Sequence, residues 1–443
     1  MYRLASVPVV AALQAAPPGP ISGADTVWLL VATALVLLMT PALGFFYGGL
    51  VRSKNVLNTM VMSFASLGAV GLAWALLGYT LAFGDGGAAV GGLGYSLLRG
   101  VGLEPGRWGA FPHLLYVAYQ GAFAIIAAAL ISGAVVERMR FGPYLAFITG
   151  WSLLVYAPVA HWVWGGGWLA RLGALDFAGG AVVHIDAGVA AVAAAMLVGS
   201  RKDYGRQAFL PHNVPYVLLG AALLWFGWFG FNAGSALAAN ATAALAFVNT
   251  LLAPAATLLV WLLLDLFRTG RATAVGAATG AVVGLVAITP AAGFVGPRSA
   301  MLLGALAAFP SYYAILWRPR TRLDDSLDVF AAHGLGGLAG ALLTGVFAER
   351  AWGAPVDGLL AGNAALLAYQ AVAALAVAVY SGVVTLVLLA AVRRVAPLRR
   401  PSSEEGIGMD VVQHGEEAYT RGEGAVLVMQ RPAARPAAPR GDR

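Results

Sequence analysis

Two of the six histidines, His184 and His333, fall inside long apolar segments, and each follows an aspartate by eight residues. Asp176 precedes His184, Asp325 precedes His333, and a run rich in Gly and Ala follows each histidine. A neutral imidazole donates a hydrogen bond from one nitrogen and accepts one on the other, so a pair at one depth could line a passage or relay a proton. Two histidines alone supply too few ligands for a metal ion. The alternative is that each is an ordinary core residue between helices.

The composition indicates the medium in which these histidines lie. Of the 443 residues, 60% are hydrophobic and 11% are charged, and the mean hydropathy is +0.78. Soluble domains carry about 25% charged residues. So few charges exclude an ordinary cytoplasmic enzyme and a nucleic-acid-binding chain, and indicate a protein embedded in a lipid bilayer. The absence of cysteine excludes disulfides and thiol chemistry.

Apolar runs bounded by charges or by Gly and Pro predict an all-α polytopic membrane protein with eleven transmembrane helices. The runs are too long for soluble amphipathic helices and lack the strict alternation of a β-barrel. The expected spans are 25–51, 58–83, 114–136, 142–162, 179–199, 214–233, 241–267, 273–291, 299–317, 328–348 and 362–392.

The two histidine units predict a five-plus-five inverted repeat. Five spans separate the units, and an odd number inverts the second copy, as is common in transporters. Eight helical residues rise about 12 Å, and the bilayer midplane lies about 15 Å from either face of the hydrocarbon core. Both histidines are therefore expected near the midplane, approached from opposite sides.

Basic residues predict the orientation. The loops and tail on one side hold 21 Lys and Arg, and the other side holds 6, so the positive-inside rule places the N-terminus outside and the C-terminus in the cytoplasm. Residues 1–24 form a lead that is either a cleaved signal peptide or an uncleaved segment. Residues 25–398 form the transmembrane domain and 399–443 a cytoplasmic tail, whose part from 420 to 443 is expected to be disordered.

Charged residues at helix ends carry further expectations. Asp176 and Asp325 should cap the histidine helices, because a carboxylate is favourable at a helix N-terminus. Asp325 is also expected to contact the tail. Glu137, Arg138 and Arg140 lie together at an inner helix end, where a solvated charge cluster is expected.

Short motifs occur in order along almost the whole chain. They are GFFYGGLVRSKN at 44–55, GAVVERMRF at 133–141, HWVWGGG at 161–167, GALDFAGGAVVH at 173–184, PHN at 211–213, GWFGFNAGS at 227–235, DVFAAHG at 328–334 and HGEEAY at 414–419. Together they resemble the ammonium transporter family (Amt/Mep/Rh), on its Amt side.

The resemblance implies a homotrimer in the plasma (inner) membrane, with one pore per subunit, no cofactor and no enzymatic activity. By position, Trp164, Ser235 and Phe123 would form an outer recruitment site for ammonium, supported from behind by Asp176. Phe123 and Phe231 would stack as a gate below it. The alternative for such aromatic residues is a belt at the lipid interface.

The resemblance also assigns the deeper positions. His184 and His333 would be the paired pore histidines, and Tyr119 and Trp228 would lie at the vestibule or beside the gate. Asp186 departs from the family pattern, which has a small or amide residue there. An offset of two residues turns about 200° around a helix, so Asp186 should point away from His184 and face a helix or subunit contact.

The residue types suggest how transport would proceed. Aromatic faces attract a cation, and a hydroxyl accepts one of its hydrogen bonds. The spans past the gate are mostly apolar, where a bare cation is costly and ammonia is not. The hypothesis is that ammonium loses its proton near the gate and ammonia crosses, with or without a separately relayed proton. The alternatives are an ammonium sensor and a rhesus-type neutral gas channel. The resemblance also implies a PII-type signalling protein as a partner at the cytoplasmic face.

Overall fold

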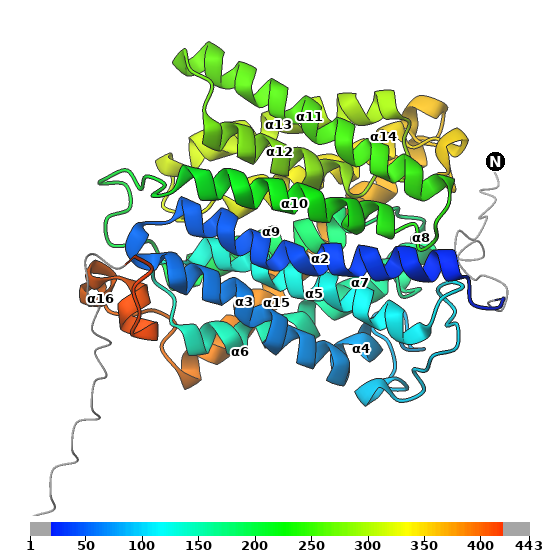
Figure 1. Ribbon diagram of the computed structural model, residues 1–443, viewed down its shortest axis with the longest axis horizontal. Helices are drawn as coiled ribbons and strands as arrows, with labels where there is room; N and C mark the ends of the chain where they lie inside the picture. The colour runs from blue at the N-terminus through cyan, green and yellow to red at the C-terminus, as the bar shows by residue number, and fades with distance from the viewer. Residues whose placement is uncertain (1–18, 420–443) are drawn as a thin grey trace, which may run out of the picture.

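The computed structural model describes residues 19–419, which form a bundle of long helices lying side by side (Figure 1). Most of the predicted lead, residues 1–18, and the predicted disordered segment 420–443 lie outside this range. The start of α2 (Gly23–Leu50) and the short α16 (Ser402–Ile407) lie at opposite ends of the bundle. Following the predicted orientation, the end that carries α16 is called the inner end.

Within the described residues, ten helical segments of at least 18 residues are apolar enough to cross a membrane, and α12 is a shorter apolar helix of 15 residues. The eleven predicted spans are therefore found. Their ends differ by at most five residues, except that the segment predicted to end at 162 continues to Leu172. The segments are α2, Ser53–Phe83 (which includes α3, Val56–Ala73, and α4, Tyr79–Phe83), α5 (His113–Val135), Phe141–Leu172 (α6, Phe141–Trp151; η4, Ser152–Tyr156; α7, Ala157–Val163; α8, Trp168–Leu172), Gly180–Val198 (η5, Gly180–Ile185; α9, Asp186–Val198), α10 (Val214–Gly234), α11 (Ala241–Thr269), α12 (Ala274–Ile288), α13 (Pro297–Trp317), Phe330–Phe347 (η7, Phe330–Leu335; α14, Gly336–Phe347) and α15 (Ala364–Val395).

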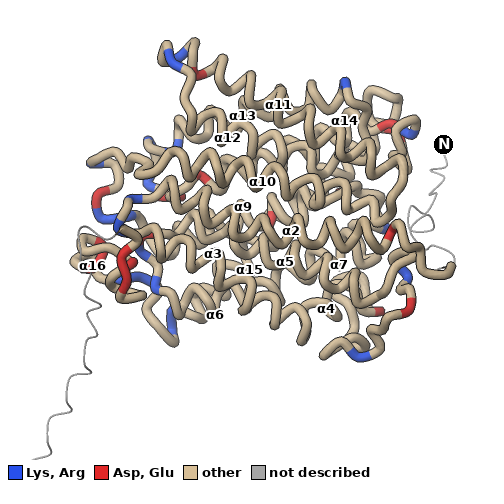
Figure 2. The backbone as a smooth tube through the Cα atoms, viewed as in Figure 1, with Lys and Arg blue, Asp and Glu red and all other residues tan. Residues whose placement is uncertain are grey.

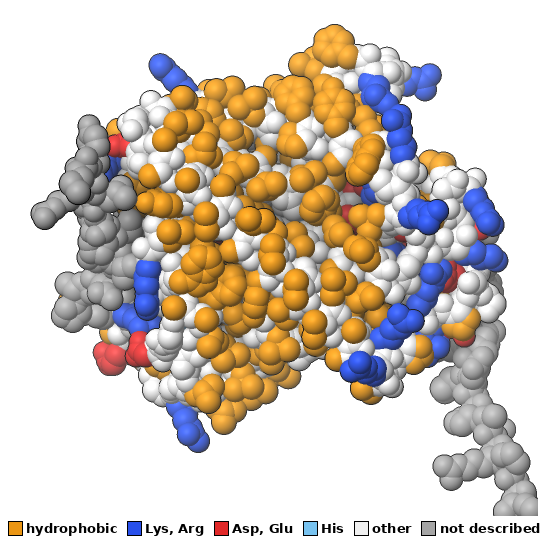
Figure 3. All heavy atoms as spheres, turned by 180° about the vertical axis from the view of Figure 1, so that it is seen from behind, with side chains coloured by type: hydrophobic (Ala, Val, Ile, Leu, Met, Phe, Trp, Pro, Cys, Tyr) orange, Lys and Arg blue, Asp and Glu red, His pale blue; other side chains and the backbone are white. Residues whose placement is uncertain are grey.

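The surface of the bundle suits a bilayer. Figure 3 shows side chains of hydrophobic type spread over the middle of one face, and Figure 2 shows Lys, Arg, Asp and Glu gathered mostly toward the two ends of the helices. Large apolar side chains such as Phe226, Phe267 and Val387 are exposed on α10, α11 and α15. This distribution places the apolar middle in lipid and the charged ends at its two faces.

Small residues allow the helices to approach closely. A Cβ added to Gly220 of α10 would lie 2.3 Å from the backbone nitrogen of Phe46 in α2, and one added to Gly230 would lie 2.7 Å from the carbonyl oxygen of Ala32. In lipid, close packing of this kind replaces the hydrophobic effect as the force between helices. The high glycine content therefore serves contacts between spans.

The inner end corrects one expectation. Glu137 and Arg138 do not form a solvated cluster, because they are 1% and 0% exposed. Arg201 donates to Glu137 and to Asp324, each at 2.8 Å, and Arg138 donates to Ser326 and to several backbone carbonyls. Loops that are distant in sequence fold over one another here. Glu137 and Arg201 are ion-paired, and the buried Arg138 guanidinium is satisfied by hydrogen bonds to Ser326 and backbone carbonyls.

Electrostatics hold this cluster in its charged form. Burial opposes ionisation of Glu137, but the guanidinium groups of Arg201 and Arg52 outweigh it and lower the pKa of Glu137 to about 2. Arg52 contributes an ion pair at 3.0 Å to the same carboxylate. The cluster therefore ties together the inner loops that follow α2, α5 and α9.

The first part of the tail packs on the inner helix ends. The backbone N–H of Asn58, in the first turn of α3, donates to the Asp410 carboxylate at 2.8 Å, and the N–H of Phe141, at the start of α6, donates to the Gln413 side chain at 2.7 Å. Met409 donates to Asn55 at 2.8 Å. The tail thus caps two transmembrane helices at their inner ends.

Candidate functional site

The two intramembrane histidines lie against each other in the interior. The Nδ1 atoms of His184 and His333 are 3.2 Å apart, the ring centroids are 5.3 Å apart and the ring planes are inclined by 18°. Both residues are buried. Such a bond requires one Nδ1 to carry a hydrogen and the other to accept it, so the two rings adopt different protonation patterns. The expected meeting of the two imidazoles is present.

Each histidine lies in a π-helical turn, η5 for His184 and η7 for His333. The wider turn re-aims side chains relative to an α-helix, and π-turns are frequent at functional sites. The same local structure in the two units fits the repeat inferred from their matched spacing.

Asp176 caps the first of these turns. Its carboxylate accepts hydrogen bonds from the backbone N–H groups of Gly179, Gly180, Ala181 and Val182 at 2.9, 2.6, 2.8 and 3.1 Å. Burial raises the pKa of Asp176, and these four donors oppose that rise. The predicted cap is therefore present, and it satisfies four amides that open the helix.

Asp325 caps the second turn with fewer bonds. Its carboxylate accepts from the backbone N–H of Phe330 at 2.7 Å. Burial raises the pKa of Asp325 as well. Among the described residues, no hydrogen bond joins its side chain to the tail, and the expected tail contact stays a prediction. Asp176 and Asp325, which occupy equivalent positions in the two repeats, thus both cap a helical turn. They accept hydrogen bonds from different numbers of backbone amides.

The two histidine segments touch through glycines. A Cβ on Gly188 would lie 2.4 Å from the backbone nitrogen of Gly334, and a Cβ on Gly337 would lie 2.7 Å from the carbonyl oxygen of Gly180. These distances leave no room for any side chain. The close crossing of the backbones is what brings the two imidazoles together.

Aromatic rings cover the histidines on the outer side. Phe123 of α5 and Phe231 of α10 stack with centroids 4.1 Å apart and planes inclined by 26°. Trp164 meets Phe123 edge to face at 6.1 Å, and its indole N–H donates to the backbone carbonyl of Asp176 at 2.8 Å. The predicted residues are thus together, and Asp176 holds both Trp164 and the start of η5.

Hydroxyl groups complete the outer cluster. The Ser235 hydroxyl donates to the carbonyl of Phe231 at 2.8 Å, and the Tyr119 hydroxyl lies 3.2 Å from the Ser235 oxygen. Tyr119 also packs edge to face on Phe123 at 5.0 Å. Of the two positions predicted for Tyr119, the vestibule and the side of the gate, its contacts with Phe123 and Ser235 fit the second.

Trp228 belongs to the deeper part of the site. Its ring stacks on His184 at 5.5 Å and 20°, and its indole N–H donates to the Thr289 hydroxyl at 2.9 Å. Sequence reasoning did not find Thr289, because a single Thr at the end of an apolar helix gives no local signal. Its role depends on a contact across 61 residues.

Two cavities open toward the site from its two ends, and the inner one borders a histidine. An outer pocket of about 500 Å³ reaches Trp164, and an inner cavity of about 720 Å³ reaches His333. Between them, a gap of about 10 Å³ beside both histidines is walled mostly by apolar side chains such as Leu43 and Ile126. That volume suits about one water-sized molecule.

Charges gather in the inner cavity. Its lining includes Arg206, Arg268 and Arg318, together with Asp328. Asp328 pairs with Arg318, and burial raises the pKa of Asp328 to about 6 although Arg318 opposes that shift. The lining therefore changes from apolar side chains at the histidines to charged side chains at the inner end.

The fold and this passage define a multi-pass membrane transport protein. The profile of the Ammonium Transporter Family matches residues 27–419. The chain is 48% identical to the ammonium transporter of Bacillus subtilis over 398 residues, which are 89% of this chain and 98% of that one. It is 45% identical to ammonium transporter Amt1 of Archaeoglobus fulgidus over 400 residues, which are 90% and 100% of the two chains.

Solved structures agree. The crystal structure of Saccharomyces cerevisiae Mep2 superposes with a TM-score of 0.82 at 35% identity, over 86% of this chain and 88% of that one. A structure described as a sensor Amt protein superposes with a TM-score of 0.82 at 29% identity, over 88% and 98%. The chain belongs to the ammonium transporter family, and the resemblance inferred from its motifs is confirmed.

Proposed function

We propose that this protein recruits ammonium at the outer aromatic cluster, removes its proton near the stacked phenyl rings and conducts ammonia past the two histidines. The observation that carries the proposal is the buried pair of His184 and His333, 3.2 Å apart, beneath the stacked rings of Phe123 and Phe231. This pair borders a gap too small for a hydrated ion.

The outer cluster has the chemistry of an ammonium site. The faces of Trp164 and Phe123 attract a cation by about 0.5–2 kcal/mol, depending on how far it is desolvated. Ser235 and Tyr119 add hydroxyl oxygens that accept N–H bonds. Potassium carries the same charge but donates no hydrogen bond, so directional acceptors favour ammonium. Asp176 supports the cluster through its carbonyl bond to Trp164.

The apolar section then selects the neutral form. Ammonium releases one proton and leaves ammonia, with the N–H electron pair kept on nitrogen. A bare cation in an apolar membrane interior is costly, whereas neutral ammonia is not. Neutral imidazoles of His184 and His333 offer both a donor and an acceptor to ammonia or to a relayed proton.

Flux measurements on reconstituted protein test this mechanism. Labelled methylammonium uptake and ammonium-evoked current are recorded for wild type, His184→Ala and His333→Ala. His113→Gln is the matched control, because His113 is a buried histidine bonded to Tyr79 and lies outside the passage. Loss of uptake or current in the two pore variants alone supports the proposal. Unchanged uptake and current in both would contradict it.

Two other functions remain as alternatives. The similarity to a structure described as a sensor Amt protein favours an ammonium sensor as the second candidate. Deletion of the tail from residue 399 separates the two: persistent uptake without any defect in nitrogen response argues against sensing. A rhesus-type gas channel would show uptake without any ammonium-evoked current.

Assembly and regulation complete the proposal. We expect a homotrimer, supported by the family membership and by broad apolar helix faces, and light scattering in detergent checks it. A PII-type protein is proposed to bind the inner face, where Arg206, Arg268 and Arg318 line the cavity mouth. Pull-down with the purified partner, with and without the tail, tests that contact.

A further inference from the structure

Asp186 is a buried carboxylate that the proposed mechanism does not use. It opens α9, two residues after His184, and is 0% exposed. Among the described residues, neither of its carboxylate oxygens has a hydrogen-bond partner, and no Lys or Arg forms an ion pair with it. An ionisable side chain inside a membrane is rare and usually marks a functional site.

The residue faces α15 rather than the pore. The Ser381 hydroxyl of α15 donates to the backbone carbonyl of Asp186 at 2.8 Å, and a Cβ on Gly382 would meet Val189 of α9 at 3.3 Å. The opposite side of the same helix carries Gly188, which touches the second histidine segment. The expectation that Asp186 points away from His184 toward a helix contact agrees with these contacts.

Other buried polar atoms lie on α15 and on the elements that pack against it. Within the described residues, the Tyr156 hydroxyl, the Trp151 indole nitrogen and the Thr385 hydroxyl also have no partner, and all three residues are 0% exposed. Trp151 and Tyr156 pack at 6.3 Å. Thr385 follows Ser381 by one turn of α15 and therefore lies on the same face.

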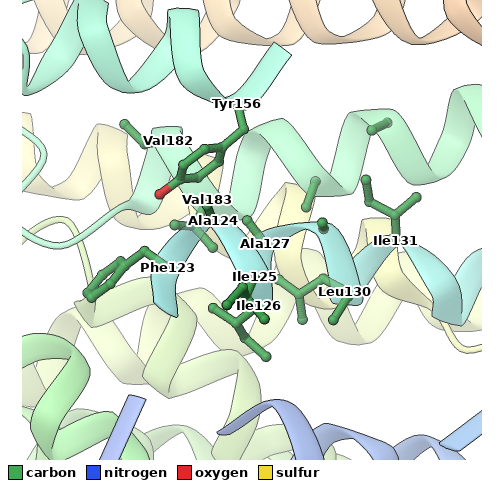
Figure 4. Packing of buried hydrophobic residues seen from close by; sticks show 14 of the residues in the cluster. Phe123, Ala124, Ile125, Ile126, Ala127, Leu130, Ile131, Tyr156, Val182 and Val183 are labelled. Atoms are coloured by element: carbon green, nitrogen blue, oxygen red, sulfur yellow. The ribbon is translucent and has the colours of Figure 1, made fainter. Parts of the chain in front are cut away.

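The contacts of α15 place these groups along one seam. Tyr380 of α15 donates to the carbonyl of Leu154 in η4 at 2.8 Å, while the neighbouring Ser381 bonds to Asp186. Helix α15 thus packs on both η4 and α9. Figure 4 shows the Tyr156 ring beside Val182, which precedes Asp186 by one helical turn.

Tyr156 links this seam to the outer site. Its ring lies beside Val182 (Figure 4), whose backbone N–H donates to the Asp176 carboxylate at 3.1 Å. The other titratable side chains near Asp186 are Tyr380 on α15 and His184 on its own segment. Asp186 is therefore a carboxylate at the depth of the histidines, on a polar seam that begins near the ammonium site.

Physical chemistry limits what such a group can do. An unpaired carboxylate in a medium of low dielectric constant is expensive, and binding a proton or hydrogen bonding to water lowers that cost. Buried water typically makes about three hydrogen bonds to polar groups that otherwise lack partners. The seam offers donors and acceptors of this kind from three helices.

Resting on the function proposed above, we propose that Asp186 binds the proton released by ammonium. Water held at Tyr156, Trp151 and Thr385 carries this proton. This proton path runs beside the ammonia passage and is separate from the histidine pair. The proton forms an O–H bond on the Asp186 carboxylate, which becomes neutral. The same O–H bond then breaks, the proton leaves toward the inner side, and the carboxylate is restored. Ammonia crosses past the histidines meanwhile.

Paired flux measurements test the assignment. Proteoliposomes carry a pH-sensitive dye inside, and proton entry is compared with labelled methylammonium uptake. Asp186→Asn and Tyr156→Phe are expected to lower the number of protons moved per methylammonium by about a hundredfold or more, as loss of a positioned proton-transfer group typically does. Tyr144→Phe is the matched control, because Tyr144 is also a buried tyrosine but bonds to the Met62 carbonyl at 3.1 Å. A wild-type ratio in both seam variants overturns the proposal.

Infrared spectroscopy supplies a readout that does not depend on transport. In reconstituted protein, the un-ionised carboxyl group of Asp186 should give a carbonyl-stretch band that shifts on exchange into heavy water and is absent in Asp186→Asn. Absence of such a band in wild type across the pH range overturns the assignment. If wild type takes up no methylammonium, the proposed function falls, and the band still decides whether Asp186 binds an exchanging proton.

Discussion

Replacing Asp176 with Asn tests whether this carboxylate holds the first histidine segment in place. Four backbone N–H groups donate to its two oxygens at 2.6–3.1 Å. A single amide oxygen accepts at most two of them, so at least two amides lose a charge-assisted bond of about 1.5–3 kcal/mol each. The favourable interaction with the helix dipole is also lost, while the desolvation cost of the charge disappears. We expect a net loss of about 3–5 kcal/mol in the free energy of unfolding.

Asp325→Asn is the matched comparison, because Asp325 occupies the equivalent position before the second histidine. It accepts one backbone N–H, from Phe330 at 2.7 Å, and an Asn oxygen can keep that bond. The expected cost is about 1 kcal/mol. The structure therefore predicts an asymmetry between two positions that the sequence presents as equivalent.

Thermal unfolding in detergent measures the stability of both variants, and methylammonium uptake measures function. The Trp164 indole donates to the backbone carbonyl of Asp176, so a shift of the Asp176 backbone also displaces Trp164. Asp176→Asn should therefore raise the KM for methylammonium as well as lower the unfolding midpoint. Asp325→Asn should change both much less. Equal destabilisation by the two substitutions, or a loss below about 1 kcal/mol for Asp176→Asn, would refute the capping argument.

Three further substitutions have defined outcomes. Glu137→Gln should lower the free energy of unfolding by about 3 kcal/mol at neutral pH. In wild type this stabilisation is present above the usual pKa of 4.5 and is lost as the pH falls toward about 2, so chemical unfolding at stepped pH should show the dependence in wild type only. Tyr119→Phe should raise the KM about fivefold through loss of one hydroxyl near Ser235, measured by competition uptake. Gly188→Ala should abolish uptake, because its Cβ would lie 2.4 Å from the backbone, whereas Gly142→Ala, with nothing within 4 Å, should leave uptake unchanged.

Much of the fold was accessible from the sequence because its constraints are local. A segment crosses lipid only if it is long and apolar and makes its backbone hydrogen bonds internally as a helix. Each of these properties can be recognised from one continuous stretch of sequence. The matched Asp-to-His spacing of Asp176 and His184 in one half, and Asp325 and His333 in the other, placed the histidines at similar depth. The motifs identified the family.

What the sequence missed depends on partners that are distant in the chain. Glu137 was expected in solvent because a charged residue at a helix end usually lies there, yet Arg201 and Arg52 from two other loops bury and pair it. Thr289 carries no local signal, and only its contact with Trp228 gives it a place in the site.

The sequence alone therefore determined which segments cross the membrane, which side chains lie at mid-depth and to which family the chain belongs. Only the tertiary structure decided that two imidazoles 149 residues apart come within 3.2 Å, that four amides share the Asp176 carboxylate and that Asp186 faces α15. Hydropathy acts on each segment separately, whereas these contacts require glycine-mediated crossings that fix the rotation and register of one helix against another.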